Sequence, residues 1–188
     1  MSTLISMKHV DLSTYNNDFY RPGNRLKVIV WYFFNVLFFI NPLNPSSYIK
    51  VLLLRSFGAK IGKGVTIKPG VNIKYPWKLK IGDHVWIGEK VWIDNLADVI
   101  IMDNVCVSQG AMLLCGNHNY KKTSFDLIVG SITLETGSWV GAKAVVCPNV
   151  TVAEHSIIAV NSVLNRSSEK FGIYQGNPAL KIRVRFIN

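Results

Sequence analysis

The sequence predicts an all-β protein, a three-sided coil of very short parallel strands, and three observations support this fold class. Fourteen aliphatic residues recur with a period of six. The residue four places after each of them is usually small or β-branched, and Gly or Asn often precedes that small residue. A period of six fits no helix. It is typical of a repeat architecture in which each hexad forms one flat side and one corner.

The aliphatic residues form three short runs and one long run. The runs are Ile61, Ile67 and Ile73; Ile81, Ile87 and Ile93; Ile101, Val107 and Leu113; and Leu134, Val140, Val146, Val152 and Ile158. A slip of two residues separates the first three runs, so the first coils are predicted to have a slightly longer corner. Stacked coils pair their backbones roughly 4.8 Å apart. We therefore expect the aliphatic residues to fill the interior, whereas an ordinary β domain would have irregular loops between its strands.

Gly and Asn mark the expected corners. Both tolerate the left-handed backbone conformation that a tight corner requires. They are Gly64, Gly70, Asn104, Gly110, Gly116, Gly137, Asn149 and Asn161. The regularity of these positions indicates that the coils continue over about a hundred residues of one domain.

The chain divides into three parts. Residues 1–58 are predicted to form a helical cap, residues 59–165 the β-helix domain, and residues 166–188 a C-terminal extension. Within the first part, Val10–Ser13 is predicted as a short edge strand. Ile49–Phe57 is predicted as a short helix that feeds into the first coil, with Gly58 ending it.

The apolar segment Leu26–Ile40 has two interpretations. Fifteen residues are too few to span a bilayer as a helix. The helix could pack against the flank of the coils or against a neighbouring subunit. Alternatively, it could lie in a membrane interface, with Arg21, Arg25 and Lys27 beside the headgroups. The sequence leaves peripheral membrane association open.

Composition limits the partners and the compartment. The formal net charge of +10 suggests an anionic partner such as a phosphorylated ligand, a nucleic acid or an anionic membrane surface. Cys106, Cys115 and Cys147 match no metal motif, and they are expected to be free thiols in a reducing cytoplasm. Residues Met1–Asp18 are polar, so we expect no signal peptide and a cytoplasmic protein, with the inner face of the membrane left open as its location.

The longest interruption of the hexads is where chemistry is expected. Fifteen extra residues, Asn119–Thr133, separate the hexad that ends at His118 from Leu134. A β-helix core gains nothing from such an excursion, and loops on rigid scaffolds often carry function. His118 stands at its root, and an imidazole is suited to remove a proton from a substrate hydroxyl near pH 7.

Several segments resemble the hexapeptide-repeat acyltransferases, and most closely the colanic-acid-type exopolysaccharide O-acetyltransferases. They are Phe57–Gly62, Tyr75–Trp77, Val85–Glu89, Val107–Gly110, Gly116–Tyr120 and Tyr174–Ala179. The resemblance implies a left-handed β-helix, which is a known exception to the right-handed crossover rule. It also implies a homotrimer and a general-base role for His118.

The same resemblance implies acetyl-CoA as co-substrate, bound in a groove between adjacent β-helices, and no metal. The positions that match the groove are Trp139, Gly141, Ala142, Ala159, Val160 and Asn161. The small residues among them could also be small only because a corner demands it. Val160 and Asn161 stand where relatives often carry Ala and Gly.

The C-terminal segment Lys181–Phe186 alternates basic and apolar residues. As a strand, it is expected to present its cations on one face and to seal the other against the coils. Arg183 matches the relatives' basic position after Gly-x-Pro-Ala, and Arg166 is a second candidate. Either guanidinium could bind a CoA phosphate, although a solvated basic tail is the plainer interpretation.

Further catalytic groups are less specific in sequence. Asp94 and Asn95 precede His118 by about one coil and are candidates for orienting it or for binding the acceptor. Backbone N–H groups or an Asn side chain could stabilise the oxyanion, and Gly88 occupies the place of an Asn found in some sugar acetyltransferases. Trp86 and Trp92 could stack on a sugar or pack between subunits.

We therefore expect an acetyl-CoA-dependent O-acetyltransferase that acts on a sugar hydroxyl in exopolysaccharide biosynthesis. The alternative acceptor is a small molecule, namely a free sugar, serine or an antibiotic. A zinc-dependent carbonic anhydrase of this fold needs three His ligands, and the four histidines have no such spacing. A nucleic-acid-binding module is not expected either, because the aromatic residues do not alternate with Lys and Arg.

Overall fold

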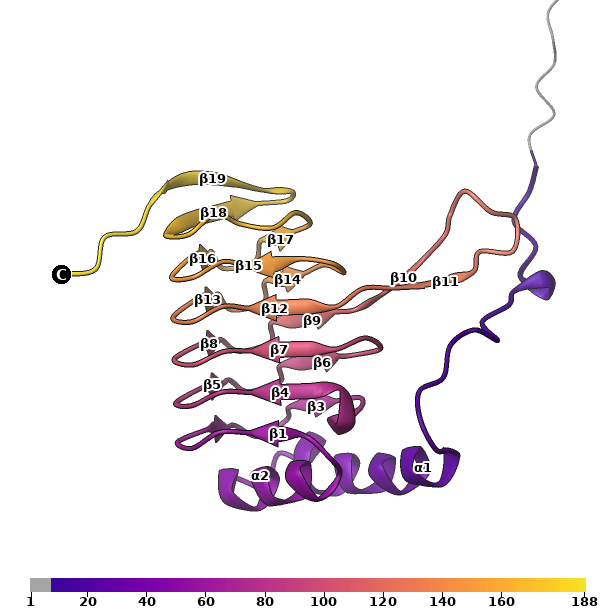
Figure 1. The fold of residues 1–188 in the computed structure, drawn as a ribbon, viewed down its shortest axis with the longest axis horizontal. Helices are drawn as coiled ribbons and strands as arrows, with labels where there is room; N and C mark the ends of the chain where they lie inside the picture. Colours follow the sequence, from indigo (N-terminus) through magenta and orange to yellow (C-terminus); the bar gives the residue numbers. More distant parts are fainter. Residues whose placement is uncertain (1–7) are drawn as a thin grey trace, which may run out of the picture.

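The computed structural model describes residues 8–188, which form a solenoid of short parallel strands with helices across one end (Figure 1). Three sheets run along it as faces A, B and C. Face A contains β1 (Lys60–Ile61), β4 (Leu79–Ile81), β7 (Val99–Ile101), β12 (Ile132–Leu134) and β15 (Thr151–Val152). Face B contains β2 (Thr66–Ile67), β5 (Trp86–Ile87), β8 (Cys106–Val107), β13 (Trp139–Val140), β16 (Ile157–Ile158), β18 (Gly172–Gly176) and β19 (Ala179–Val184). Face C contains β3 (Asn72–Ile73), β6 (Trp92–Asp94), β9 (Met112–Leu114), β14 (Val145–Val146) and β17 (Val163–Leu164).

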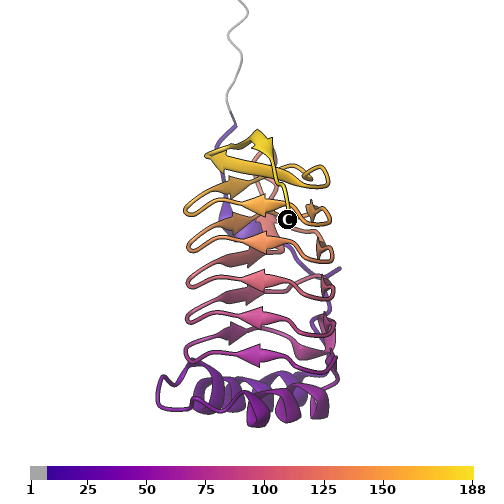
Figure 2. The same ribbon diagram turned by 90° about the vertical axis from the view of Figure 1, so that its left-hand side faces the viewer.

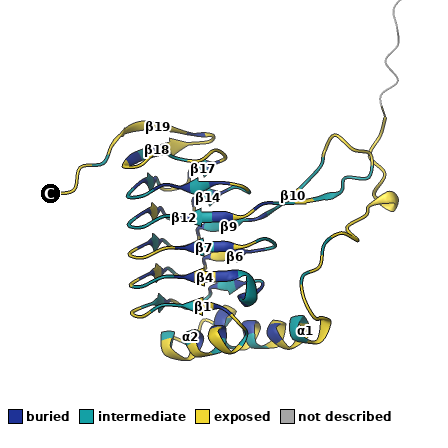
Figure 3. Cartoon of the chain, viewed as in Figure 1, coloured by how far each residue is buried: buried dark blue, intermediate teal, exposed yellow. Residues whose placement is uncertain are grey.

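The aliphatic residues of the hexads stack in register and form the core. Ile81 lies between Ile61 and Ile101 on face A, and Leu134 continues the same column. All of these hexad residues from Ile67 to Ile158 are buried (Figure 3). The predicted parallel β-helix is therefore confirmed, together with the longer early coils.

The corners repeat a left-handed backbone conformation three residues after an aliphatic position. Positive φ is found at Gly64, Gly70, His84, Lys90, Asn104, Gly110, Gly137, Lys143, Asn149, His155 and Asn161. Gly116 was expected in this set, but it lies in a strand and has no positive φ. The reason is that the chain leaves the coil there instead of turning its corner.

Two helical segments close the first coil. The predicted helix over Leu26–Ile40 is present as α1 (Arg25–Phe34), which continues as the π-helical segment η2 (Asn35–Ile40). The second helix, α2 (Ser47–Ser56), leads into β1. Both lie across the end of the solenoid, perpendicular to its axis (Figures 1 and 2). We call α1, η2 and α2 together the cap.

The cap supplies hydrogen bonds to the edge strand of each face, which would otherwise expose unpaired backbone groups. On face A, the Arg55 guanidinium donates to the carbonyl oxygens of Ile61 and Gly62. On face C, the Trp31 indole N–H donates to the carbonyl of Ile73, 2.8 Å away. These contacts explain why the cap stays on the solenoid.

Face B is closed by the ammonium group of Lys50, which is fully buried. Its Nζ donates to the carbonyl oxygens of Asn44, 2.9 Å away, and Ile67, 3.3 Å away. Burial lowers the pKa of Lys50. These two acceptors compensate the group for its removal from water.

Two expectations for the ends of the chain are wrong. No strand forms at Val10–Ser13, because the Asp11 side chain accepts from the Ser13 N–H and starts a 3-10 turn, η1 (Leu12–Thr14). The C-terminal strand does form, as β19, but its apolar side is not sealed, since Ile182 is 52% exposed. β19 pairs only with β18 at the end of face B, so no further coil covers it.

Candidate active site

His118 lies in β10 (Gly116–His118), one arm of a hairpin that leaves the solenoid after face C. The other arm is β11 (Leu127–Val129), and His118 pairs with Leu127 across the hairpin. The hairpin projects well beyond the coils (Figure 1). The excursion predicted from the interrupted hexads is thus an ordered arm, with His118 half-buried where it begins.

One hydrogen bond sets the tautomer of His118. Its Nδ1 lies 2.9 Å from the carbonyl oxygen of Phe125. A carbonyl can only accept, so Nδ1 carries the hydrogen and the neutral ring has its lone pair on Nε2. A general base needs such an available lone pair together with a fixed ring.

Aromatic side chains hold the imidazole ring. Phe125 stacks on it with a centroid distance of 4.5 Å and an interplanar angle of 8°. Tyr15 lies on it at 5.9 Å. Phe125 has a φ of 51°, a strained conformation for a non-glycine residue, and such strain is often found at functional sites. Neither residue was predicted from the sequence, because only the folded hairpin brings them to His118.

The N-terminal segment reaches the hairpin through its backbone. The Asp11 N–H donates to the carbonyl of Thr123, 2.8 Å away. The Asn16 N–H lies 3.4 Å from the Asp126 carboxylate. These bonds place Tyr15 beside His118, so residues distant in sequence complete the wall around the ring.

Asp94 and Asn95 lie one coil below the root of the hairpin. Asp94 is in register with Leu114, and its buried carboxylate accepts from Lys74 Nζ at 2.9 Å. The Asn95 amide is fully buried and bonds the Tyr75 backbone with both its oxygen and its nitrogen. Among residues 8–188, no hydrogen bond joins either side chain to His118.

Cys115, directly before the hairpin, is not placed for nucleophilic chemistry. Its side chain is fully buried, and this burial raises the pKa of the thiol to about 11. A thiol is a good nucleophile only as the thiolate. Cys115 is therefore not suited to form an acyl-cysteine intermediate.

A groove on face B unites most of the predicted cofactor-binding positions. A cavity of about 400 Å³ is lined by Trp139, Gly141, Ala142, Ala159, Val160 and Arg183, among others. Arg183 reaches this cavity from β19, which pairs with β18 beside β16. Asn161 and Arg166 do not line it: Asn161 is an exposed corner residue with a φ of 57°, and Arg166 is exposed beyond β17.

The small residues of the groove also have a structural reason. A Cβ on Gly141 would lie 2.6 Å from the carbonyl oxygen of Ile158 and 2.7 Å from the amide nitrogen of Val160. Both atoms belong to the backbone of the next coil. Gly141 is therefore required by the stacking of coils, whether or not a ligand binds there.

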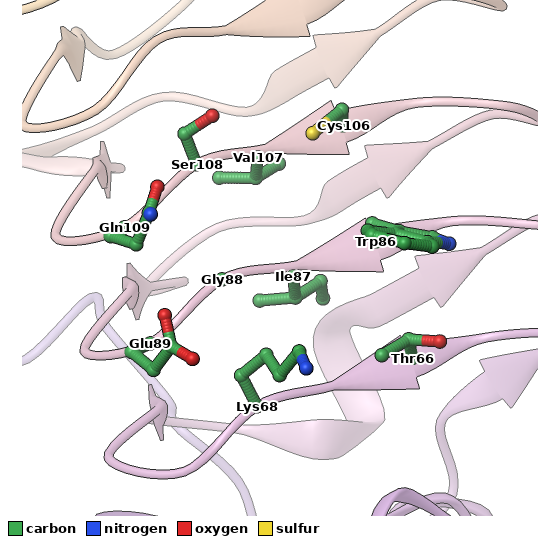
Figure 4. Close-up of a pocket in the computed structure, with 10 residues that line it drawn as sticks. All are labelled: Thr66, Lys68, Trp86, Ile87, Gly88, Glu89, Cys106, Val107, Ser108 and Gln109. Carbon is green, nitrogen blue, oxygen red and sulfur yellow. The ribbon is translucent and has the colours of Figure 1, made fainter.

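A second cavity continues the groove toward the cap. It has a volume of about 330 Å³ and shares Ser108 and Gln109 with the first. Figure 4 shows Thr66, Trp86 and Cys106 above one another in three coils, with Lys68 and Glu89 near the corner. Two joined cavities along face B can accommodate a long, thin ligand.

Trp86 and Trp92 lie on different faces. Trp86 is on face B in this second cavity, whereas Trp92 is on face C, in a cavity lined by Trp31 and Tyr75. The two indoles therefore cannot hold one sugar ring between them within a single chain.

Residues 8–188 contain no group of three His, Cys, Asp or Glu side chains close enough together to bind a metal ion.

The groove and His118 lie on opposite sides of one chain. In Figure 1 the β10–β11 hairpin projects from the right of the solenoid, whereas β8, β13 and β16 lie at its left. A ligand in the groove of one chain is thus remote from the imidazole of that chain.

Comparison with known proteins identifies relatives of this chain. It is 33% identical to the colanic acid biosynthesis acetyltransferase WcaF of Escherichia coli K12 over 166 residues, which cover 88% of this chain and 91% of WcaF. A chloramphenicol acetyltransferase of Agrobacterium fabrum is 32% identical over 60 residues, or 32% of this chain and 29% of that protein. No protein-family model matches the chain.

Solved structures share the fold. A galactoside acetyltransferase in complex with coenzyme A superposes with a TM-score of 0.75 and 22% identity, covering 85% of this chain and 80% of that one. The hexapeptide-repeat acetyltransferase VCA0836 of Vibrio cholerae, in complex with acetyl-CoA, gives a TM-score of 0.70 and 23% identity, over 76% and 80% of the two chains. From the hexads, the three-sided solenoid and the similarity to WcaF over most of both sequences, the chain belongs to the hexapeptide-repeat acetyltransferase family.

Proposed function

We propose that the protein is an acetyl-CoA-dependent O-acetyltransferase that acetylates a sugar hydroxyl in exopolysaccharide biosynthesis. The observation that carries this proposal is the 33% identity to WcaF, because it extends over 91% of that protein and so includes more than the shared hexads. The face-B groove supports the co-substrate, since its joined cavities and Arg183 suit a long molecule with phosphates at one end.

In the proposed reaction, His118 acts as the general base. Its Nε2 accepts the proton of the acceptor hydroxyl while that oxygen attacks the carbonyl carbon of the thioester. The new C–O bond forms, the C–S bond breaks, and the CoA sulfur leaves and takes up a proton. Backbone N–H groups near the site would stabilise the oxyanion. The Phe125 carbonyl stabilises the imidazolium that forms, because it accepts from Nδ1.

The active site is proposed to form between copies in a homotrimer. The hairpin of one copy would enter the groove of its neighbour, which supplies the acetyl-CoA. The placement of β10 and β13 on opposite sides of one solenoid supports this arrangement (Figure 1). In a closed ring with such head-to-tail contacts, every copy donates one hairpin and one groove.

Asp94 is proposed to position the hairpin rather than to contact the substrate. Its backbone carbonyl accepts from the Cys115 N–H at 3.2 Å, and its carboxylate is held by Lys74. Asn95 has no free amide group for an acceptor sugar, because Tyr75 occupies both of its polar atoms. Its geometry supports a structural role under the hairpin.

Arg183→Ala is expected to raise the Kd for CoA about tenfold to a hundredfold, because a charge-assisted hydrogen bond to a phosphate is lost. Isothermal titration with CoA measures the change. Lys181→Ala is the matched control on the same strand, since its ammonium group is paired with Glu169. Equal CoA affinity in the Arg183 variant and the wild type would remove Arg183 from the site.

The proposal is tested by an acceptor screen that follows CoA release from acetyl-CoA. Nucleotide sugars, oligosaccharide repeat units, free sugars, serine and chloramphenicol are offered separately. Turnover with glycan acceptors supports the proposal. The short similarity to chloramphenicol acetyltransferases makes a small molecule the second candidate. Turnover with serine or chloramphenicol, and none with glycans, would replace the first proposal by the second.

The reaction is proposed to take place in the cytoplasm, at the inner face of the membrane. The three cysteines are free thiols, which suits a reducing compartment. No helix of residues 8–188 is long and apolar enough to cross a bilayer. The support for a membrane surface comes from the cap.

A further inference from the structure

The outer side of the cap exposes many large apolar side chains. We call this surface the outer cap face. Its residues are Leu26, Ile29, Val30, Phe33, Leu37, Ile40, Leu43, Tyr48, Ile49 and Leu52, all exposed. In α1 and η2, Leu26, Val30, Phe33 and Leu37 follow helical spacing and lie opposite the buried Trp31 and Phe39. The exposed residues form the end of the molecule below the first coil (Figures 1 and 3).

Burial of the inner side of the cap is already complete without these residues. Trp31 and Phe39 are almost entirely buried against the first coil, and so is Leu54 of α2. Most of the apolar surface of the outer cap face is therefore left exposed by the packing within the chain. Apolar patches of this kind usually mark a contact with a partner or a membrane.

The stretch of sequence that forms the cap and the adjacent coil carries charges of one sign only. Residues 19–82 contain eleven Lys or Arg and no Asp or Glu, whereas the rest of the chain has ten basic and eleven acidic residues. The whole positive net charge therefore comes from the cap and the coil next to it. Arg21, Arg25 and Lys60 are exposed there and form no ion pair with a described carboxylate.

This charge decides between the possible occupants. Two outer cap faces brought together would juxtapose two basic surfaces without a single carboxylate between them, and such like-charge contacts are unfavourable. An anionic lipid surface complements both the charge and the apolar side chains of the cap. Its headgroups pair with cations, and its acyl boundary accepts the apolar side chains. We propose that the outer cap face is a membrane-binding surface that selects anionic lipids.

The geometry fits a helix pair lying in the interface. α1 and η2 together have 16 residues, Arg25–Ile40, so the segment is about 24 Å long and lies across the end of the solenoid. It can sink its apolar side by roughly 5–10 Å without crossing the bilayer. The solenoid axis would then stand upright on the membrane, with the groove and the hairpin above the lipid surface.

Flotation with lipid vesicles tests the proposal without any need for the acceptor or acetyl-CoA, so its failure is distinguishable from failure of the proposed function. The probes are vesicles of equal parts phosphatidylglycerol and phosphatidylcholine, and vesicles of phosphatidylcholine alone. The full chain is expected to float with the first and to bind the second at least about tenfold more weakly. High salt should weaken the first interaction, because exposed charges are screened.

Two variants separate the apolar and the charged contributions. Phe33→Ser with Leu37→Ser removes apolar contact, and Arg21→Gln with Arg25→Gln removes charge. Each pair is expected to reduce binding to anionic vesicles about tenfold. Leu180→Ser with Phe186→Ser is the control, because these side chains are at least as exposed and lie at the opposite end of the solenoid. Circular dichroism checks that each variant is folded, and the charge pair provides the test if the apolar pair does not fold.

Two outcomes would overturn the proposal. One is a wild-type chain that does not float with anionic vesicles. The other is an equal loss of binding in the control at the far end, which would indicate nonspecific adhesion. Size-exclusion chromatography identifies the competing occupant. If the Phe33 and Leu37 variant changes oligomeric state, and neither the wild type nor any variant binds vesicles, the outer cap face is an interface between copies.

Discussion

His118→Asn is expected to lower kcat by about a hundredfold to ten-thousandfold, the range typical of losing a general base. The Asn amide can still donate to the Phe125 carbonyl, so a side-chain hydrogen bond from position 118 to that carbonyl is retained. What disappears is the lone pair on Nε2. Steady-state kinetics with the acceptor from the screen measures the loss, and the KM for acetyl-CoA should stay close to the wild-type value.

His84→Asn is the matched control for this variant. His84 is a corner residue with a φ of 56°, a conformation that Asn also adopts readily, and it lies far along the chain from the hairpin. Its replacement is expected to leave kcat within a factor of about two, as for a surface change without a special role. Wild-type kcat in His118→Asn would refute the general-base assignment.

Ile101→Ala is expected to lower the free energy of unfolding by about 2–5 kcal/mol, since the side chain is fully buried and the rigid coils cannot collapse onto the cavity. Ile101 lies between Ile81 below and Leu134 above in the face-A column. Removing its branched end leaves both neighbours without contacts. Urea unfolding followed by circular dichroism measures the change, at one protein concentration because any assembly of copies would contribute to stability.

Met102→Ala is the control for this prediction. Met102 is the next residue and is 40% exposed, so its truncation should change the free energy of unfolding by less than about 1 kcal/mol. Similar unfolding midpoints for the two variants would mean that the aliphatic column is not the source of stability.

The repeat architecture was predictable because its cause is local and periodic. Each hexad contributes one aliphatic residue that packs into or against the core, so the register of β1, β4 and β7 follows from the spacing of Ile61, Ile81 and Ile101. The corner residues were less predictable by type. His84 and His155 adopt positive φ although neither is Gly or Asn, because the stacked coils impose the corner conformation on whatever residue stands there.

The groove positions were implied by the family resemblance, whereas the surroundings of His118 could not be predicted. Trp139 and Ala159 line one cavity because hexads in successive coils place their residues on one face. The wall around His118 depends on the path of the hairpin and on an N-terminal segment a hundred residues away. No pattern in the sequence indicates that Tyr15 and Phe125 lie against the same ring.

The ends of the chain were the least predictable parts, because side-chain hydrogen bonds and pairing with one neighbour decide their structure. Asp11 starts a turn where a short edge strand was predicted. Arg185 belonged to a row of three equivalent cations in sequence, but its guanidinium donates to the carbonyl of Gly137, 3.0 Å away. This contact leaves Arg183 as the cation of that strand that lines the groove.

In the proposed assembly, one active site combines His118 of one copy with the face-B groove of another. Mixing two inactive variants tests it most directly. His118→Asn lacks the base, and Ala142→Trp fills the cavity of about 400 Å³ with an indole. Each protein is unfolded, mixed in equal amounts with the other and refolded, and the acetylation rate is measured. If copies assemble at random in a ring, about a quarter of the sites combine an intact hairpin with an intact groove, so about a quarter of the wild-type rate should return. A mixture as inactive as either variant alone, in assemblies that contain both chains, would contradict the shared site.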